Sequence, residues 1–171
     1  SLVSRGFLYY GLSNIPIAFL KHVRANYLDF VIIMVDESYT KIRRVLDLIE
    51  EELLVPCIII TRNKSDMLHE FLLRSRITTC LLKPVSKDTL KNIADISVAN
   101  YKKIINYENK IKKLNKKMDN RMVIEKAKWL LVEKEDYTEK EAYELIRKRS
   151  RDNRVEMVKI AHTIILSWEG K

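Results

Sequence analysis

The chain has 171 residues, which is enough for one ordinary domain and a smaller one. With 47% hydrophobic residues but only 3 glycines and 3 prolines, it has the composition of a globular protein with long helices. Its longest apolar run falls well short of the roughly 18 residues that span a bilayer, and no signal peptide is visible, so we expect a cytoplasmic protein with no membrane partner. The net charge of +9 resides mainly in residues 87–171, which contain 21 basic and 14 acidic side chains. Residues 1–86 contain 11 basic and 9 acidic side chains. This excess of positive charge in the second half favours a polyanionic partner.

Short apolar runs alternate with helical patterns in the first half of the chain. Strands are predicted where apolar, β-rich residues run without interruption, as in buried parallel strands: 6–11, 29–35, 56–61 and 78–82. Helices are predicted between them, at 15–28, 38–53 and 64–76. The alternation predicts right-handed βαβ units and a parallel sheet covered on both faces. Cys57 and Cys80 lie inside two of the apolar runs, where we expect buried, reduced thiols rather than a disulfide.

Beyond Pro84 the pattern becomes helical. Ser86 is a good N-cap, and no Pro, Gly or β-rich run interrupts the chain from there to about Glu135. Within this helix apolar residues recur at a three-four spacing between lysines and asparagines, which is a heptad seam: Ile104, Tyr107, Ile111, Leu114 and Met118. One helix packed on its own domain is an alternative interpretation. A two-stranded coiled coil, and therefore a homodimer, is favoured because the surrounding residues are too polar to be buried on more than one stripe.

The end of the chain has the pattern of three amphipathic helices, at about 119–135, 138–151 and 154–168. Thr138 with Glu141 three residues later forms a capping box that opens the middle helix. Three short amphipathic helices predict a small bundle. Its inner stripes are expected to comprise Ile124, Ala127, Leu130 and Leu131, then Ala142, Leu145 and Ile146, then Val155, Val158, Ile160, Ala161, Ile164 and Ile165.

The stretches "VPCIIIT" and "LLKPVSKDTL" resemble the second half of a bacterial response-regulator receiver domain. In that family a Thr ends the fourth strand and a Lys-Pro pair with a cis peptide bond ends the fifth, positions held here by Thr61 and Lys83-Pro84. The resemblance implies a flavodoxin-like α/β fold. The family's first strand and helix have no counterpart, because 6–11 fits the second strand best; either the sequence begins inside the domain or this receiver is natively shortened.

The residues that a receiver needs for phosphorylation are not in place. Met34 stands at the phosphoacceptor position, and Asp36 follows two residues later, about 6–7 Å further along an extended strand. Residues 1–28 contain no Asp or Glu to hold the divalent metal that the chemistry requires. Thr61 and Lys83 are therefore interpreted as remnants that cap strands, and the domain as a pseudo-receiver that serves dimerisation or docks a regulatory protein. A phospho-switch that uses Asp36 is the alternative.

The segment from Ile124 to Ile165 resembles the ANTAR domain, the RNA-binding module of bacterial transcription antitermination regulators. The residues that carry the resemblance fall in place without a gap: Ala127-Lys128, Leu131, Thr138, Glu141-Ala142-Tyr143, Leu145-Ile146-Arg147, Ser150 and Ala161. Two positions depart from the family, because Trp129 replaces a Gly and Val132 replaces a Met. The Trp129 indole either stacks on a loop base or blocks the site. The expected organisation is a receiver-like domain at 1–86, a coiled-coil linker helix at 87–118 and an ANTAR three-helix domain at 119–171.

This resemblance implies that the chain holds two adjacent hairpins in nascent mRNA and so prevents an overlapping terminator hairpin. Residues 119–171 contain 12 basic and 11 acidic side chains, so binding is expected to be local and directed at the hairpin loops. Ala142 and Tyr143 fit core packing equally well, and Lys148 and Arg149 are interpreted as solvated charge. The predicted RNA-binding residues are Lys126, Lys128, Trp129, Ala142, Tyr143, Arg147, Ser150, Arg151 and Arg154.

An enzyme is the least supported class of function. The three histidines stand singly without metal-ligand spacing, and a chain with three glycines has no Gly-rich phosphate loop. We therefore expect no catalytic residues, cofactor or metal ion. The alternatives to RNA binding are a dimeric protein-interaction adaptor with a degenerate ANTAR domain and, less well supported, DNA binding by the terminal helices, which lack helix-turn-helix spacing.

Overall fold

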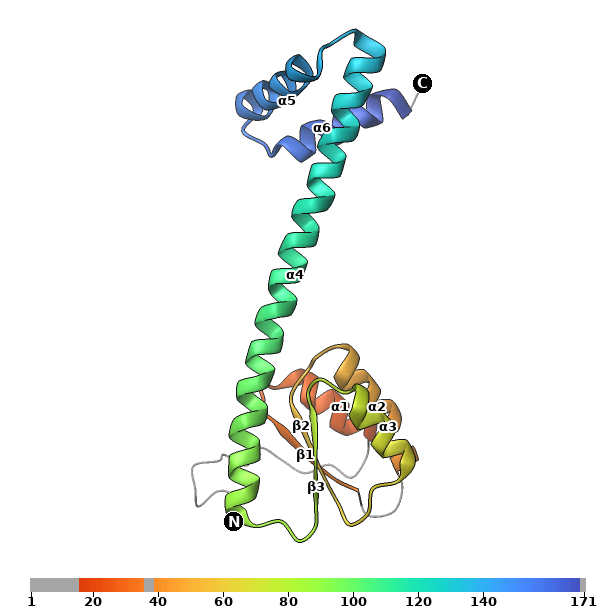
Figure 1. The fold of residues 1–171 in the computed structure, drawn as a ribbon, viewed down its shortest axis with the longest axis vertical. Coiled ribbons are helices and arrows are strands. Elements are labelled where there is room, and N and C mark those ends of the chain that lie inside the picture. Colours follow the sequence, from red (N-terminus) through yellow and green to blue (C-terminus); the bar gives the residue numbers. More distant parts are fainter. Residues whose placement is uncertain (1–15, 36–38, 170–171) are drawn as a thin grey trace. The chain divides into compact units, whose positions relative to one another are not determined.

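The computed structural model describes residues 16–35 and 39–169. The chain divides into two compact units, Ser1–Tyr107 and Glu108–Lys171, called here the N-terminal and the C-terminal unit. One long helix, α4 (Lys87–Glu135), belongs to both (Figure 1). Among the described residues no helix is long and apolar enough to cross a membrane.

A parallel sheet forms the centre of the N-terminal unit. Its described strands are β1 (Val31–Val35), β2 (Cys57–Thr61) and β3 (Thr78–Leu82), in the order β1-β2-β3. Val31 pairs with Cys57, which in turn pairs with Thr78, so the three strands end at one edge of the sheet. Every residue of β2 is buried, as expected for a central strand whose sequence, "CIIIT", is apolar without interruption.

Helices cover both faces of this sheet (Figure 1). The helices α1 (Pro16–Ala25), α2 (Tyr39–Glu51) and α3 (Asp66–Arg74) lie on one side and α4 on the other. Alternate residues of β2 serve the two cores. Cys57 and Ile59 belong to the cluster that includes Leu46, Ile49 and Phe71, and Ile58 and Ile60 belong to the cluster that includes Ala94 of α4. This alternation is the two-residue period of a strand buried on both faces.

The α/β expectation for this unit is confirmed, with small differences at the ends of the elements. The predicted strand 29–35 begins at Val31, and the predicted strand 6–11 lies outside the described residues. The Lys83-Pro84 peptide bond is cis, as the receiver resemblance implies. Both cysteines are free thiols; Cys57 is buried and Cys80 is half-buried. Burial raises the pKa of both thiols.

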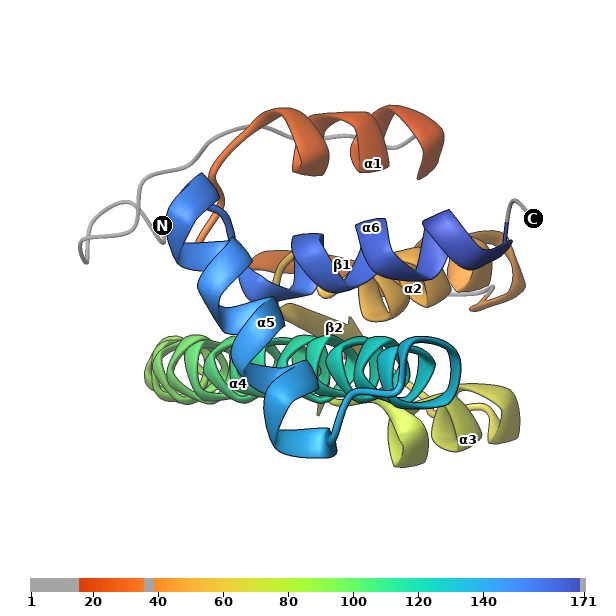
Figure 2. The same cartoon turned by 90° about the horizontal axis from the view of Figure 1, so that it is seen from above.

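The C-terminal unit is helical and combines residues 108–135 of α4 with α5 (Glu139–Asn153) and α6 (Met157–Glu169). The linker helix and the first bundle helix, predicted at 87–118 and 119–135, form one continuous helix of 49 residues. Figure 2 shows α5 and α6 diverging from their connecting turn. The buried core consists of seven residues of the predicted inner stripes: Ala127, Leu131, Ala142, Ile146, Ala161, Ile164 and Ile165. Ile124, Leu130, Leu145 and Ile160 are partly buried against it, whereas the predicted Val155 and Val158 are not part of this cluster.

Candidate nucleic-acid interface

A capping box fixes the start of α5. The Thr138 hydroxyl oxygen accepts a hydrogen bond from the Glu141 amide (3.3 Å), and the Glu141 carboxylate accepts from the Thr138 amide (2.9 Å) and hydroxyl (2.6 Å). These hydrogen bonds lower the pKa of Glu141. The predicted capping box is therefore present, and it sets the direction in which α5 leaves α4.

Lys128 connects α4 to the same helix start. Its ammonium group donates to Glu125 on α4 (2.9 Å) and to Glu139 at the start of α5 (2.7 Å), and its side chain is only 9% exposed. The hydrogen bond to Glu139 is the main cause of a raised Lys128 pKa, and the same bond lowers the pKa of Glu139. The prediction that Lys128 contacts RNA does not agree with this geometry, because the charge is enclosed by two carboxylates.

Ala142 and Tyr143 are neighbours with different environments. Ala142 has no exposed surface and lies in the core with Ala127 and Ala161, where three small side chains let the helices approach closely. Its predicted contact with RNA is corrected to a packing role. Tyr143 is 42% exposed and Trp129, on α4, is 69% exposed. The indole that replaces the family's glycine thus lies largely in solvent and is not part of the buried core.

Ser150 and Arg154 form the turn between α5 and α6. Arg154 caps α5 with left-handed backbone angles (φ 55°, ψ 39°), and its amide donates to the Arg151 carbonyl (3.2 Å). The Val155 amide donates to the Ser150 carbonyl (3.0 Å), and the Ser150 hydroxyl donates to the Val155 carbonyl (2.5 Å). Ser150, predicted to bind RNA, therefore has its hydroxyl hydrogen engaged in holding the turn.

Charge is separated along the C-terminal unit. Residues 119–146 contain 5 basic and 8 acidic side chains, whereas residues 147–159 contain 6 basic and 2 acidic ones. We call residues 147–159, which form the end of α5 and the start of α6, the basic turn. The near-neutral total of residues 119–171, with 12 basic and 11 acidic side chains, thus conceals a concentrated positive region.

Most cations of the basic turn have no ion-pair partner in the part of the chain that the structure describes. Arg147 contacts Glu144 (3.2 Å), an exposed pair three residues apart on one helix, which holds the arginine weakly. No ion pair is found among the described residues for the other five cations, Lys148, Arg149, Arg151, Arg154 and Lys159. Unpaired cations that are close together in the sequence provide the positive charge that binding to phosphate groups requires.

The receiver-motif residues gather at the carboxyl edge of the sheet. Met34 is 66% exposed near the end of β1, and Thr61 ends β2 next to Val35. The Thr61 hydroxyl donates to the Asn63 carbonyl (2.9 Å), and the Lys83 amide donates to the Thr61 carbonyl (2.8 Å). Asp36 lies outside the described residues. Among those described, no group of three or more His, Cys, Asp or Glu side chains forms a metal-binding cluster.

The predicted coiled-coil seam is largely solvent-exposed in the single chain. Tyr107, Ile111, Leu114 and Met118 are all at least half exposed, and Met122 continues the stripe. Ile104 departs from the seam, because it packs against the core of the N-terminal unit. The exposed apolar stripe on α4 therefore begins at Tyr107.

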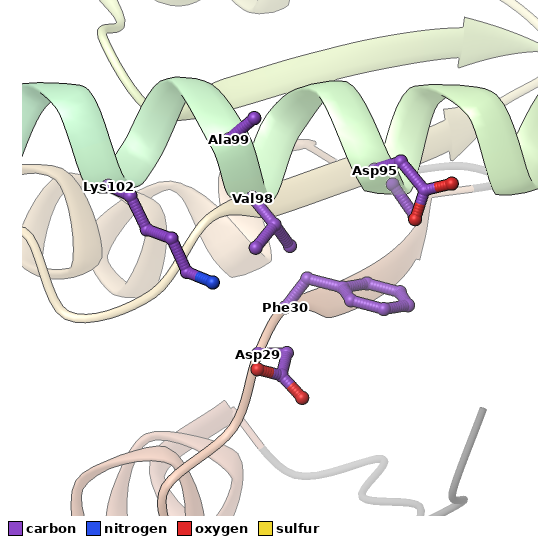
Figure 3. A pocket seen from close by; sticks show the side chains of 7 residues that line it. Asp29, Phe30, Asp95, Val98, Ala99 and Lys102 are labelled. Carbon is purple, nitrogen blue, oxygen red and sulfur yellow. The ribbon is translucent and has the colours of Figure 1, made fainter. Parts of the chain in front are cut away.

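A shallow hollow of about 390 Å³ lies in the N-terminal unit (Figure 3). Phe30, just before β1, faces Val98 of α4 across it. Asp29, Asp95 and Lys102 line its edges, so the lining carries charges of both signs. None of these residues belongs to the motifs identified in the sequence.

Residues 112–165 match the model of a protein family described as the ANTAR domain. The chain is also similar to the transcriptional regulatory protein PdtaR of Mycobacterium tuberculosis, in strain CDC 1551 / Oshkosh and in strain ATCC 25618 / H37Rv. In each comparison 85 residues align with 28% identity, covering 50% of this chain and 42% of the relative. The alignment thus covers less than half of the length of these relatives.

Proposed function

We propose that this chain, with an ANTAR domain at residues 112–165, is an RNA-binding regulator of transcription antitermination. It binds two adjacent hairpins in nascent mRNA and thereby favours that RNA fold over the competing terminator. The observation that carries the proposal is the position of the basic turn, 147–159, inside the matched domain. Five of its six cations have no ion-pair partner among the described residues. The name of the similar M. tuberculosis protein, a transcriptional regulatory protein, is consistent with it.

The surface that contacts RNA is proposed to consist of the exposed members of the predicted set. Arg151 and Arg154 bind phosphates or stack on bases, and Arg147 exchanges its weak pair with Glu144 for an RNA contact. Tyr143 and Trp129 offer exposed rings for stacking, and Lys126 adds an exposed cation. Lys128, Ala142 and Ser150 position this surface.

The apolar stripe from Tyr107 to Met122 is proposed to join two copies of the chain. A parallel pair of α4 helices would cover side chains that are at least half exposed in one copy. Two copies provide two ANTAR domains for two hairpins, and the second contact benefits from the high effective concentration created by the first. The N-terminal unit acts in this proposal as a pseudo-receiver that docks a regulatory protein.

The test is a titration of the full chain against a labelled RNA with two adjacent hairpins, at near-physiological salt. The control RNA has the same stems and scrambled loops. We expect binding that depends on the loops. Arg151→Ala should weaken it roughly tenfold, as for the loss of a contact of about 1–3 kcal/mol. Lys140→Ala, which removes a cation from the acidic end of the same helix, should change it little.

Equal and strongly salt-dependent binding to both RNAs, or no binding to either, would overturn the proposal. The exposed Trp129 would then favour the second candidate, a protein-interaction adaptor, because a large indole in solvent is a common protein contact. An adaptor would show no affinity for hairpins at any salt concentration at which the chain stays folded.

A further inference from the structure

A groove of about 470 Å³ opens between the end of α5 and the first turns of α6, within the C-terminal unit. Its floor is apolar and consists of Val155, Ile160 and Ile164. Ile164 is also part of the core, so the floor is held rigidly by the packing of the unit. The volume lies in the range of about 300–1,000 Å³ typical of small-ligand sites, which is room for a nucleotide.

The rims of the groove carry two cations and no acidic side chain. Arg149 and Asn153 line it from α5, and Lys159 and Thr163 line it from α6. The side-chain cations of Arg149 and Lys159 have no ion-pair or hydrogen-bond partner among the described residues. The two cations lie ten residues apart in the sequence and border the same groove only because the turn at Arg154 folds α6 back beside α5.

The two neutral polar side chains on the rims present acceptors. The Asn153 amide nitrogen donates to the Arg149 carbonyl (2.8 Å), which leaves its side-chain oxygen to accept. The Thr163 hydroxyl donates to the Lys159 carbonyl (3.1 Å), which leaves the lone pairs of its oxygen to accept. A ligand that fits this groove has a flat apolar face, N–H donors at its edge and negative charge beside it.

We propose that the groove between α5 and α6 binds one unpaired RNA base, with Arg149 and Lys159 holding the phosphates on either side of it. This inference rests on the proposed RNA-binding function and adds the place and chemistry of one contact. The base lies on Ile160 and Val155, and Asn153 and Thr163 accept hydrogen bonds from its amino group. A base in a duplex has this edge occupied by its partner, so only a loop base can enter.

The chemistry selects among the bases. Adenine, cytosine and guanine carry an exocyclic amino group, which offers donors to Asn153 and Thr163, whereas uracil carries none. Arg149, interpreted from the sequence as plain solvated charge, becomes a binding residue in this proposal. It differs from Lys148, the preceding cation on the same helix, which does not line the groove.

The experiment uses the full chain and the two-hairpin RNA, with each loop base replaced in turn by uridine. For the wild type, one replacement in each loop should weaken binding roughly tenfold, since a lost base contact is worth about 1–3 kcal/mol. In the isosteric variant Thr163→Val the same replacement should cost less than about threefold. Arg149→Ala should weaken binding to all RNAs about equally and lower the salt slope by about one, while the matched control Lys148→Ala should not.

The outcomes separate this proposal from the general one. The groove proposal would be overturned, and RNA binding left intact, if binding depended on the loops but two further results were observed. These results are that Thr163→Val does not change the effect of the uridine replacement, and that Arg149→Ala and Lys148→Ala weaken binding equally. Absence of loop-dependent binding by the wild type would overturn both. Unchanged urea unfolding of each variant, followed by tryptophan fluorescence, would show that any effect arises in the groove and not from misfolding.

Discussion

The ammonium group of Lys128 lies between two carboxylates, one on its own helix and one on α5. The contact with Glu139 joins residues eleven positions apart, so it fastens the start of α5 to α4. A side chain that is 9% exposed and doubly paired is costly to disturb, because removing one carboxylate leaves an enclosed charge with fewer partners. At the scale of single residues, the proposed RNA surface thus depends on an ion pair that lies outside it.

The stability of the C-terminal unit is expected to depend on pH through Glu139. The pKa of Glu139 is lowered in the folded chain. Its contribution to the free energy of unfolding is therefore fully present above the ordinary glutamate pKa of about 4.3, and it is lost as the pH falls through the lower pKa of the folded chain. The pKa of Lys128 is raised in the folded chain. Its contribution to stability is therefore fully present below the ordinary lysine pKa and is lost only as the pH rises through the pKa of the folded chain.

Glu139→Gln should therefore lower the urea midpoint at neutral pH, and its difference from the wild type should shrink toward zero in acid. Trp129 and Trp168 are the only tryptophans and both lie in the C-terminal unit, so their fluorescence reports on this unit alone. Glu133→Gln is the control, because Glu133 forms an exposed pair with the adjacent Lys134. A difference between Glu139→Gln and wild type that is constant with pH would contradict the assignment.

The Thr138 side chain is expected to stabilise the unit through the capping box. Thr138→Ala removes the hydroxyl that caps the Glu141 amide and should lower the free energy of unfolding by about 1 kcal/mol. Thr138→Ser keeps the hydroxyl and should recover most of that loss. If alanine and serine at this position gave the same urea midpoint, the hydroxyl would not be the stabilising group.

At the scale of elements, α4 changes its environment along its length. Ala94 is buried against the sheet, Ile104 packs on the N-terminal core, and Ala127 and Leu131 are buried in the C-terminal core. Between these regions the stripe from Tyr107 to Met122 faces solvent in a single chain. A helix that is polar all round except for one apolar stripe satisfies that stripe best against a second helix.

We expect Leu114→Asp to convert the proposed dimer into a monomer. The substitution places a charge in the middle of the apolar stripe, where a second α4 helix would enclose it. Sedimentation equilibrium of the full chain measures the change. Lys116→Asp reverses the charge at an exposed position away from the stripe, which is a larger change of charge than Leu114→Asp makes. It should leave the proposed dimer intact. A wild type that is monomeric at all accessible concentrations would show that the stripe does not join two copies.

At the scale of the whole molecule, an α/β unit and a helical unit, for which we propose RNA binding, share one continuous helix. The N-terminal unit keeps the receiver remnants at the edge of its sheet, with Thr61 engaged with the Asn63 carbonyl and Met34 exposed. A thioether does not accept a phosphoryl group. The input to this unit is therefore expected to be a bound protein and not phosphate.

Incubation of the full chain with acetyl phosphate and Mg²⁺ should leave its intact mass unchanged, since the receiver resemblance places Met34 at the acceptor position. The informative comparison is with Asp36→Asn. A mass gain of one phosphoryl group in the wild type that disappears in this variant would show a live phospho-switch at Asp36 and refute the expectation.

Local sequence patterns determined the elements of this protein. Apolar runs predicted β1, β2 and β3, and Thr138 with Glu141 predicted the start of α5, because strand period and helix caps involve residues only a few positions apart. Only the tertiary structure decided what individual side chains do. Lys128 and Ala142 belong to the RNA-facing motif by sequence, yet packing encloses the first between carboxylates and buries the second. Arg149 and Lys159 border one groove because α6 folds back beside α5. Burial and contacts between helices depend on how distant segments pack, which a pattern of neighbouring residues does not contain.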